Sequence, residues 1–254
     1  METLGGARIL ILSGSGPFAD PWHPMAETSA VLAAALQGVG SIVIRYTEPG
    51  VLDDIADFDL VVLNIGAPPL SDDVTADIVD NPIAHSARAA LLTGLISWTR
   101  CGGRILAVHQ TLLAAEKHPS LAEVLGANWV TGVSGHPPIG DLTLKIDPNV
   151  LPTPYQTLAD LLGAVSKIPM SDERYFGLRY APEIVPFGFV TLTDPELASV
   201  GLAHLANDAP AVWEQTAHGG STIVSSLGHD ARCYASAAYC SFLQDMAKWL
   251  LTCD

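Results

Sequence analysis

Two histidines in this sequence follow predicted strands directly. His109 comes after the apolar run 104–108 and before helix-forming residues that begin at Gln110. His229 comes after the predicted strand that ends at Leu227. Side chains at such strand-to-helix elbows border the ligand crevice of open α/β sheets, because the carboxyl ends of parallel strands meet there. Each imidazole could act as an acid, a base or a metal ligand, or could only hydrogen-bond a neighbouring loop.

Two more histidines lie in loops that could reach the same edge of the sheet. His136 lies in the glycine- and proline-rich stretch 134–138, where Pro137 favours an extended conformation. His23 follows Trp22 in the loop after the first predicted strand. The indole could stack on a sugar face or simply cover the core, and a loop histidine could make one hydrogen bond and nothing more.

Acidic side chains are concentrated in the segment 171–175, which contains Asp172, Glu173 and Tyr175. Successive side chains of an extended segment point to opposite sides, so we expect only one of the two carboxylates to face a pocket. A solvated turn is the alternative interpretation.

The elements that must position these residues alternate along the chain. Apolar runs predict strands, and stretches of strong helix formers between them predict helices, which together indicate a mostly parallel sheet covered on both faces. The run 142–146 predicts an added antiparallel or edge strand, and Pro186 should keep part of the strand region 183–192 out of a central ladder. With no internal repeat or linker, we expect one domain over residues 1–254. The other expected strands are 8–12, 41–46, 59–64, 104–108 and 221–227, and the expected helices are 26–36, 87–99 and 235–251.

Composition limits the partners and the compartment. The 254 residues carry a formal net charge of −15, which disfavours nucleic acid and anionic membrane surfaces as partners. No apolar run approaches the roughly 20 residues of a membrane-spanning helix, and the start lacks the pattern of a secretory signal. Four cysteines without a CxxC pair indicate free thiols in a reducing cytoplasm. The 49% hydrophobic content, together with the frequency of symmetric assemblies, favours a homodimer.

Several short motifs occur along the chain: Gly102-Gly103-Arg104, Ala107-Val108-His109, Leu125-Gly126, Gly135-His136-Pro137, Asp172-Glu173-Arg174-Tyr175, Pro210-Ala211-Val212-Trp213 and Leu227-Gly228-His229-Asp230. Taken in their order and spacing, these motifs resemble the ThuA-like, or trehalose-utilisation, family. The resemblance covers nearly the whole chain, and any single motif would be weak evidence. It implies a fold similar to that of class I glutamine amidotransferases, a flavodoxin-like three-layer α/β sandwich with a mostly parallel central sheet.

The same resemblance excludes one chemistry. In a class I amidotransferase the elbow carries a nucleophilic cysteine, whereas the matching position here is His109. An imidazole cannot replace a thiolate in forming a glutamyl thioester, so we do not expect amidotransfer.

What the resemblance implies instead is work on carbohydrates, on sugars or oxidised sugars such as 3-keto-glycosides, by a lyase, isomerase or hydrolase. A carbonyl at C3 acidifies the C2 hydrogen, so that a base can remove it and an electrophile can hold the enediolate. The expected catalytic residues are His109, His136, Glu173 and His229. No cofactor is certain, although the three histidines at 109, 136 and 229 could bind a divalent metal ion. Expected substrate contacts are Trp22, His23, Asp172, Tyr175, Trp213 and Asp230.

One alternative function stays open, and the substrate is not determined. The chain could be a non-catalytic sugar- or metabolite-binding protein on the same scaffold. It also departs from the family pattern at Gly219-Gly220-Ser221-Thr222, where Gly-Arg commonly precedes the last strand, so the sequence leaves the sugar undetermined.

Overall fold

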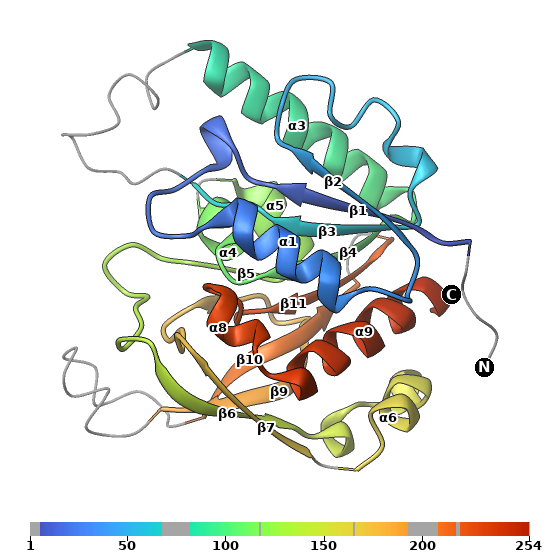
Figure 1. The fold of residues 1–254 in the computed structure, drawn as a ribbon, viewed down its shortest axis with the longest axis vertical. Coiled ribbons are helices and arrows are strands. Elements are labelled where there is room, and N and C mark those ends of the chain that lie inside the picture. Colours follow the sequence, from blue (N-terminus) through green and yellow to red (C-terminus); the bar gives the residue numbers. More distant parts are fainter. Residues whose placement is uncertain are drawn as a thin grey trace.

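The computed structural model describes residues 6–67, 82–116, 118–164, 166–192, 208–216 and 219–253. Strands from both halves of the chain form one nine-stranded sheet, in the order β2-β1-β3-β4-β11-β10-β9-β6-β7 (Figure 1). The first five strands in this order pair in parallel, in the arrangement typical of flavodoxin-like folds. They are β1 (Arg8–Ser13), β2 (Ser41–Tyr46), β3 (Leu60–Asn64), β4 (Arg104–Val108) and β11 (Ser221–Ser225).

The other four strands extend the sheet in antiparallel fashion. They are β10 (Asp208–Gln215), β9 (Val185–Thr191), β6 (Gly140–Ile146) and β7 (Ser166–Asp172). The flavodoxin-like α/β prediction is therefore confirmed, with a parallel core inside a mixed sheet. The sequence pattern did not predict β7 and β10, because Pro169 and Pro210 interrupt their short apolar stretches. Pro186 lies in β9, and the ladder between β9 and β6 covers only Gly188 to Val190 of that strand.

Helices cover both faces of the parallel core, which makes three layers. Alternate side chains of a strand point to opposite faces, so Ile9 and Ile11 belong to one apolar core while Leu10 and Leu12 belong to the other. Burial on both faces is the reason that these strands are almost continuously apolar. One face carries α1 (Met25–Ala35), α8 (Ala231–Tyr234) and α9 (Ala237–Thr252), and the other carries α3 (Pro82–Arg100), α4 (Thr111–Glu116) and α5 (Pro119–Leu125).

Smaller elements complete the described structure. Helix α6 (Gln156–Leu162) packs near α9, and β5 (Ala127–Asn128) pairs with β8 (Arg179–Tyr180) in a separate two-stranded sheet. Among the described residues, no helix is long and apolar enough to cross a membrane. The expectation of one domain over residues 1–254 stays a prediction.

Strand direction decides which residues meet at the edge of the sheet. Strands β1, β4 and β11 are parallel, so their carboxyl ends lie on the same side. From β11 to β7 the direction reverses at each of four antiparallel pairings, which leaves β7 pointing the same way as β11. The carboxyl end of β7, where Asp172 and Glu173 lie, therefore faces the same edge as the ends of the parallel strands.

Candidate metal centre

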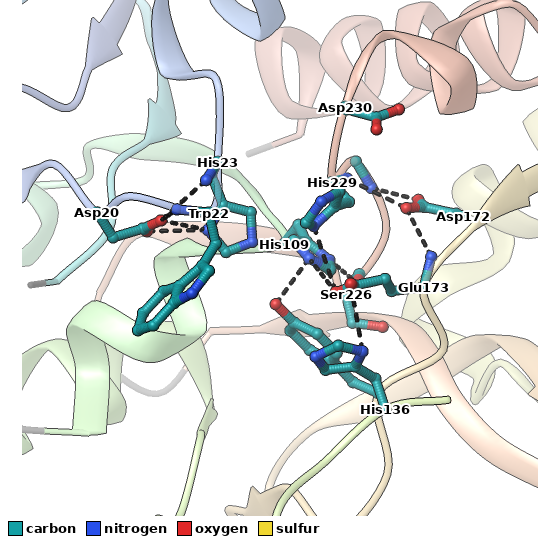
Figure 2. Close-up of polar contacts among 12 residues, drawn as sticks. Asp20, Trp22, His23, His109, His136, Asp172, Glu173, Ser226, His229 and Asp230 are labelled. Carbon is teal, nitrogen blue, oxygen red and sulfur yellow. Dashed lines mark hydrogen bonds and ion pairs between the residues drawn. The ribbon is translucent and has the colours of Figure 1, made fainter. Parts of the chain in front are cut away.

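The elbow after β4 holds His109 in an unusual backbone conformation. Among the described residues it is the one non-glycine residue with a positive φ, at 24°, and its side chain is fully buried. Its Nδ1 lies 2.8 Å from the carbonyl oxygen of Ser226. A carbonyl only accepts hydrogen bonds, so Nδ1 carries a proton, and whenever the ring is neutral its lone pair is on Nε2. The ring of His109 lies beside those of His23 and His229 (Figure 2).

The loop between β1 and α1 brings in His23. Both oxygens of Asp20 lie close to its Nδ1, at 2.7 and 2.9 Å, and one of them also accepts the backbone N–H of His23. The Nε2 atom is buried and has no hydrogen-bond partner among the described residues. Burial lowers the pKa of His23, in spite of the nearby carboxylate, so the ring is neutral at neutral pH. A neutral ring with its Nδ1 proton held by Asp20 presents a free lone pair on Nε2, which is the form that binds a metal ion.

At the end of β7 the two neighbouring carboxylates point in different directions, as the extended segment predicts. Asp172 accepts the backbone N–H groups of Gly228, at 2.6 Å, and His229, at 3.2 Å. It is 1% exposed and ties the loop after β11 to β7. The Glu173 carboxylate faces the histidines instead. Its Oε2 lies 3.4 Å from Nε2 of His109 and 3.3 Å from Nδ1 of His229.

The charges of these groups are strongly coupled. Burial by itself would raise the pKa of Glu173, but the adjacent His109 and His229 outweigh it and hold that pKa far below its ordinary value. Burial would likewise lower the pKa of His229, yet Glu173 outweighs it and raises that pKa above 6.5. The pocket therefore keeps an ionised carboxylate among imidazoles, which suits a bound cation.

Four side chains could share one metal ion. His23, His109, Glu173 and His229 each offer a ligand atom, and these atoms all lie within 4.8 Å of one another. Two ligands about 2.0–2.1 Å from a tetrahedral ion would be about 3.4 Å apart. The separations of Glu173 from His109 and His229 match this value. Three imidazoles and one carboxylate suit zinc, manganese or iron.

His136 lies at the rim of this group. Its side chain is 38% exposed, and its Nδ1 lies 3.2 Å from Oε1 of Glu173. The loop that carries it is fixed to the segment after β7 by two backbone hydrogen bonds between Gly135 and Phe176. The structure thus groups His23, which we expected to contact substrate, with His109 and His229, and places His136 beside Glu173 at a more exposed position.

The remaining predicted site residues have different surroundings. Trp22 is 54% exposed beside His23, and the Tyr175 hydroxyl lies 2.7 Å from Nε2 of His109. Asp230 accepts the backbone N–H of Arg232 at the start of α8 and pairs with its guanidinium. Trp213 is fully buried and its Nε1 donates to the carbonyl oxygen of Leu125, so the structure does not bring it to the histidines.

Sequence reasoning missed two residues that orient the site. Asp20 and the carbonyl of Ser226 each hold the Nδ1 side of an imidazole. An acid three residues before His23 was a detectable pattern, since metal-ligating histidines usually donate their other N–H to a carboxylate or a carbonyl. The Ser226 carbonyl carries no sequence signal, because every residue has one.

No protein-family model matches the chain, and no curated protein matches it. Solved structures do. A protein described as ThuA-like from Parabacteroides merdae aligns with a TM-score of 0.66 at 14% identity, over 98% of this chain and 90% of that one. A cytoplasmic protein of Salmonella typhimurium aligns with a TM-score of 0.58 at 14% identity, over 96% and 99%.

A β-galactosidase from Rahnella aligns with a TM-score of 0.53 at 14% identity, over 95% of this chain and 31% of that one. The chain therefore has the ThuA-like fold, which also occurs as one part of larger β-galactosidases. At this identity the likeness concerns the fold alone.

Proposed function

We propose that this protein is a ThuA-like, metal-dependent enzyme that acts on carbohydrates, with oxidised 3-keto-glycosides as its substrate class. The observation that carries the proposal is the meeting of His23, His109, Glu173 and His229 at the carboxyl ends of strands, with ligand atoms within 4.8 Å. The ThuA-like fold supports the choice of sugars, because the resemblance of the sequence to that family implies carbohydrate work.

The donor set fits a divalent ion better than it fits a structural ion-pair network. Within the part of the chain that the structure describes, the buried Nε2 atom of His23 has no hydrogen-bond partner. A buried polar atom without a partner costs about 1–3 kcal/mol, and a bound ion would remove that cost. A divalent ion here would polarise the C3 carbonyl of a keto sugar and so acidify the hydrogen on C2.

The protein's own residues would then move the proton. We assign His136 as the base, because it is the one histidine of this group that is more than a third exposed and it lies 3.2 Å from Glu173. It would take the C2 proton, and the C–H electron pair would form the C2=C3 bond of an enediolate. Collapse of the enediolate re-forms the C3 carbonyl, forms a C1=C2 bond and breaks the bond from C1 to the anomeric oxygen, which leaves with that electron pair and takes up the proton held by His136.

Amidotransfer is not part of the proposal. The elbow position carries His109. Burial raises the pKa of the Cys233 thiol well above its ordinary value, so that thiol is a poor nucleophile. Cys101 is exposed and precedes β4, whereas the site lies after the carboxyl end of that strand.

The test is to incubate the purified protein with a panel of 3-keto-glycosides, with and without zinc or manganese, and to follow release of the anomeric substituent. We expect turnover that a chelator abolishes and that metal restores, and no turnover by the E173Q variant. Saturable sugar binding without turnover would favour the alternative, a non-catalytic sugar- or metabolite-binding protein. Turnover unaffected by chelation would contradict the metal centre.

We also propose that the protein works in the cytoplasm as a homodimer. The cytoplasmic Salmonella protein with the same fold supports the compartment, and the free state of all four cysteines agrees with it. The apolar composition supports the dimer. Light scattering on the eluting protein would measure its mass, and a monomer would contradict this part of the proposal.

A further inference from the structure

We propose that the Tyr175 hydroxyl lowers the metal affinity of this centre, because it hydrogen-bonds the lone pair on Nε2 of His109 that a metal ion would need. The inference rests on the metal centre proposed above. The hydroxyl oxygen lies 2.7 Å from Nε2 of His109, which is a hydrogen-bonding distance. A metal ion binds the neutral form of the ring, and in that form Nε2 has no proton, so the tyrosine hydroxyl donates and the imidazole accepts.

The direction of this hydrogen bond follows from the other side of the ring. Nδ1 of His109 must carry the proton, because it meets the carbonyl of Ser226 at 2.8 Å. The backbone amide of His109 is also fixed, by the carbonyl oxygen of Ser225 at 2.8 Å. The ring therefore presents one lone pair in one direction, toward Tyr175 and Glu173.

A metal ion and the hydroxyl cannot both use that lone pair. A nitrogen has a single lone pair, and a metal ion would lie about 2.0–2.1 Å from Nε2 along its axis. Metal binding must therefore break the Tyr175–His109 hydrogen bond. The free energy of that hydrogen bond opposes metal binding and so weakens the metal affinity. No described residue competes in this way at His23, whose Nε2 has no partner among them.

Burial makes the competition effective. Tyr175 is 2% exposed and its ring stands 4.1 Å from the His109 ring and 5.0 Å from the Trp129 ring, centre to centre. Water therefore has little access to replace the hydroxyl as donor in the metal-free protein. Removing the hydroxyl would leave Nε2 buried and unpaired, which destabilises the metal-free state and leaves the loaded state much less affected.

The experiment compares zinc affinity, measured against a chelator of known affinity, in the wild type and in the Tyr175→Phe variant. We expect the variant to bind zinc about two- to tenfold more tightly, the range that one buried hydrogen bond corresponds to. The matched control is Tyr180→Phe, because the Tyr180 hydroxyl donates to the carbonyl of Pro210 and lies outside the donor set. Unchanged or weaker zinc binding in Tyr175→Phe would overturn the inference.

Thermal unfolding provides a second readout, which does not depend on catalysis. Metal-free Tyr175→Phe should unfold at a lower temperature than metal-free wild type, and saturating zinc should close the gap. A gap that zinc leaves unchanged would indicate a purely structural role and overturn the inference. A further outcome is that zinc binds the wild type and depends on Glu173, yet Tyr175→Phe shows neither the tighter affinity nor the closing temperature gap. That result would overturn only the role of Tyr175 and would leave the metal centre standing. If zinc binds neither protein, the metal centre falls with it.

Discussion

Asp20 holds the Nδ1 atom of His23 with both of its carboxylate oxygens, at 2.7 and 2.9 Å, while Nε2 of the same ring is buried and meets no partner in the described residues. An imidazole oriented in this way is prepared to bind something on its free side. Asp20 lies outside the four-residue donor set, yet it fixes the tautomer and the direction of one donor.

We expect Asp20→Asn to weaken zinc binding about 10- to 100-fold, the usual effect of removing such an orienting carboxylate. The asparagine keeps the size of the side chain but neither its charge nor its second acceptor oxygen. Competition with a chelator measures the affinity. The control is Asp141→Asn, at an exposed position on β6. Equal losses in the two variants would show that the effect is one of general surface charge.

Glu173 is the one anionic donor of the group, so Glu173→Gln should weaken zinc binding at least about tenfold. The amide is nearly isosteric, and we expect the circular dichroism spectrum to be unchanged. Glu183→Gln is the matched control, because Glu183 is exposed. Zinc affinity that survives in Glu173→Gln would contradict the proposed donor set.

Zinc affinity should rise with pH. Burial would lower the pKa of His229, but Glu173 outweighs it and raises that pKa, so the metal-free protein holds a proton there up to a higher pH than an ordinary histidine does. Zinc must displace this proton, so affinity increases as the pH rises through the raised pKa and then levels off. In the metal-free protein the same shift contributes stability that is complete below about pH 6.5 and is lost as the pH rises through the folded pKa.

Calorimetry in two buffers of different ionisation enthalpy would count the protons released on zinc binding. We expect release at neutral pH in the wild type and less in Glu173→Gln, because the amide no longer raises the pKa of His229. Zinc binding that is independent of both pH and buffer would contradict the assignment of His229 as a donor.

Backbone strain at the elbow should be measurable. His109 has a φ of 24°, in the left-handed region that costs a residue with a side chain about 1–2 kcal/mol. His109→Gly should therefore unfold with a free energy about 1 kcal/mol higher than that of His109→Ala, in urea titrations of the two metal-free variants. Both variants lose the imidazole, so neither should bind zinc as the wild type does. If His109→Ala were as stable to unfolding as His109→Gly, or more stable, the backbone at the elbow would not be strained in these variants.

The main effect of replacing Asp172 should be on the stability of the fold. Its buried carboxylate accepts the backbone N–H groups of Gly228 and His229. An amide at this position would turn an N–H group toward other N–H groups, so Asp172→Asn should lower the free energy of unfolding by about 2 kcal/mol or more. It should also weaken zinc binding by displacing His229. A stable variant with normal zinc affinity would show that the loop after β11 is held by other contacts.

The residues that sequence reasoning placed best are those at the ends of strongly apolar strands. His109 and His229 follow β4 and β11, and both strands were expected because runs buried on two faces are apolar throughout. The choice between Asp172 and Glu173 was also anticipated in part, since neighbouring residues of an extended segment face opposite sides. Which one faces the pocket was not predictable from that alternation.

The sequence by itself determined the parallel core, because local apolar periodicity and helix propensity specify strands and helices whatever their partners are. It also supplied the residue types of the site and the absence of a cysteine at the elbow. Only the tertiary structure decided which of these residues meet. Four antiparallel pairings had to reverse direction between β11 and β7 before Glu173 could lie 3.3 Å from His229, and no local pattern encodes that number of pairings. The exchange of places between His23 and His136 has the same cause, because a loop's path depends on what it packs against.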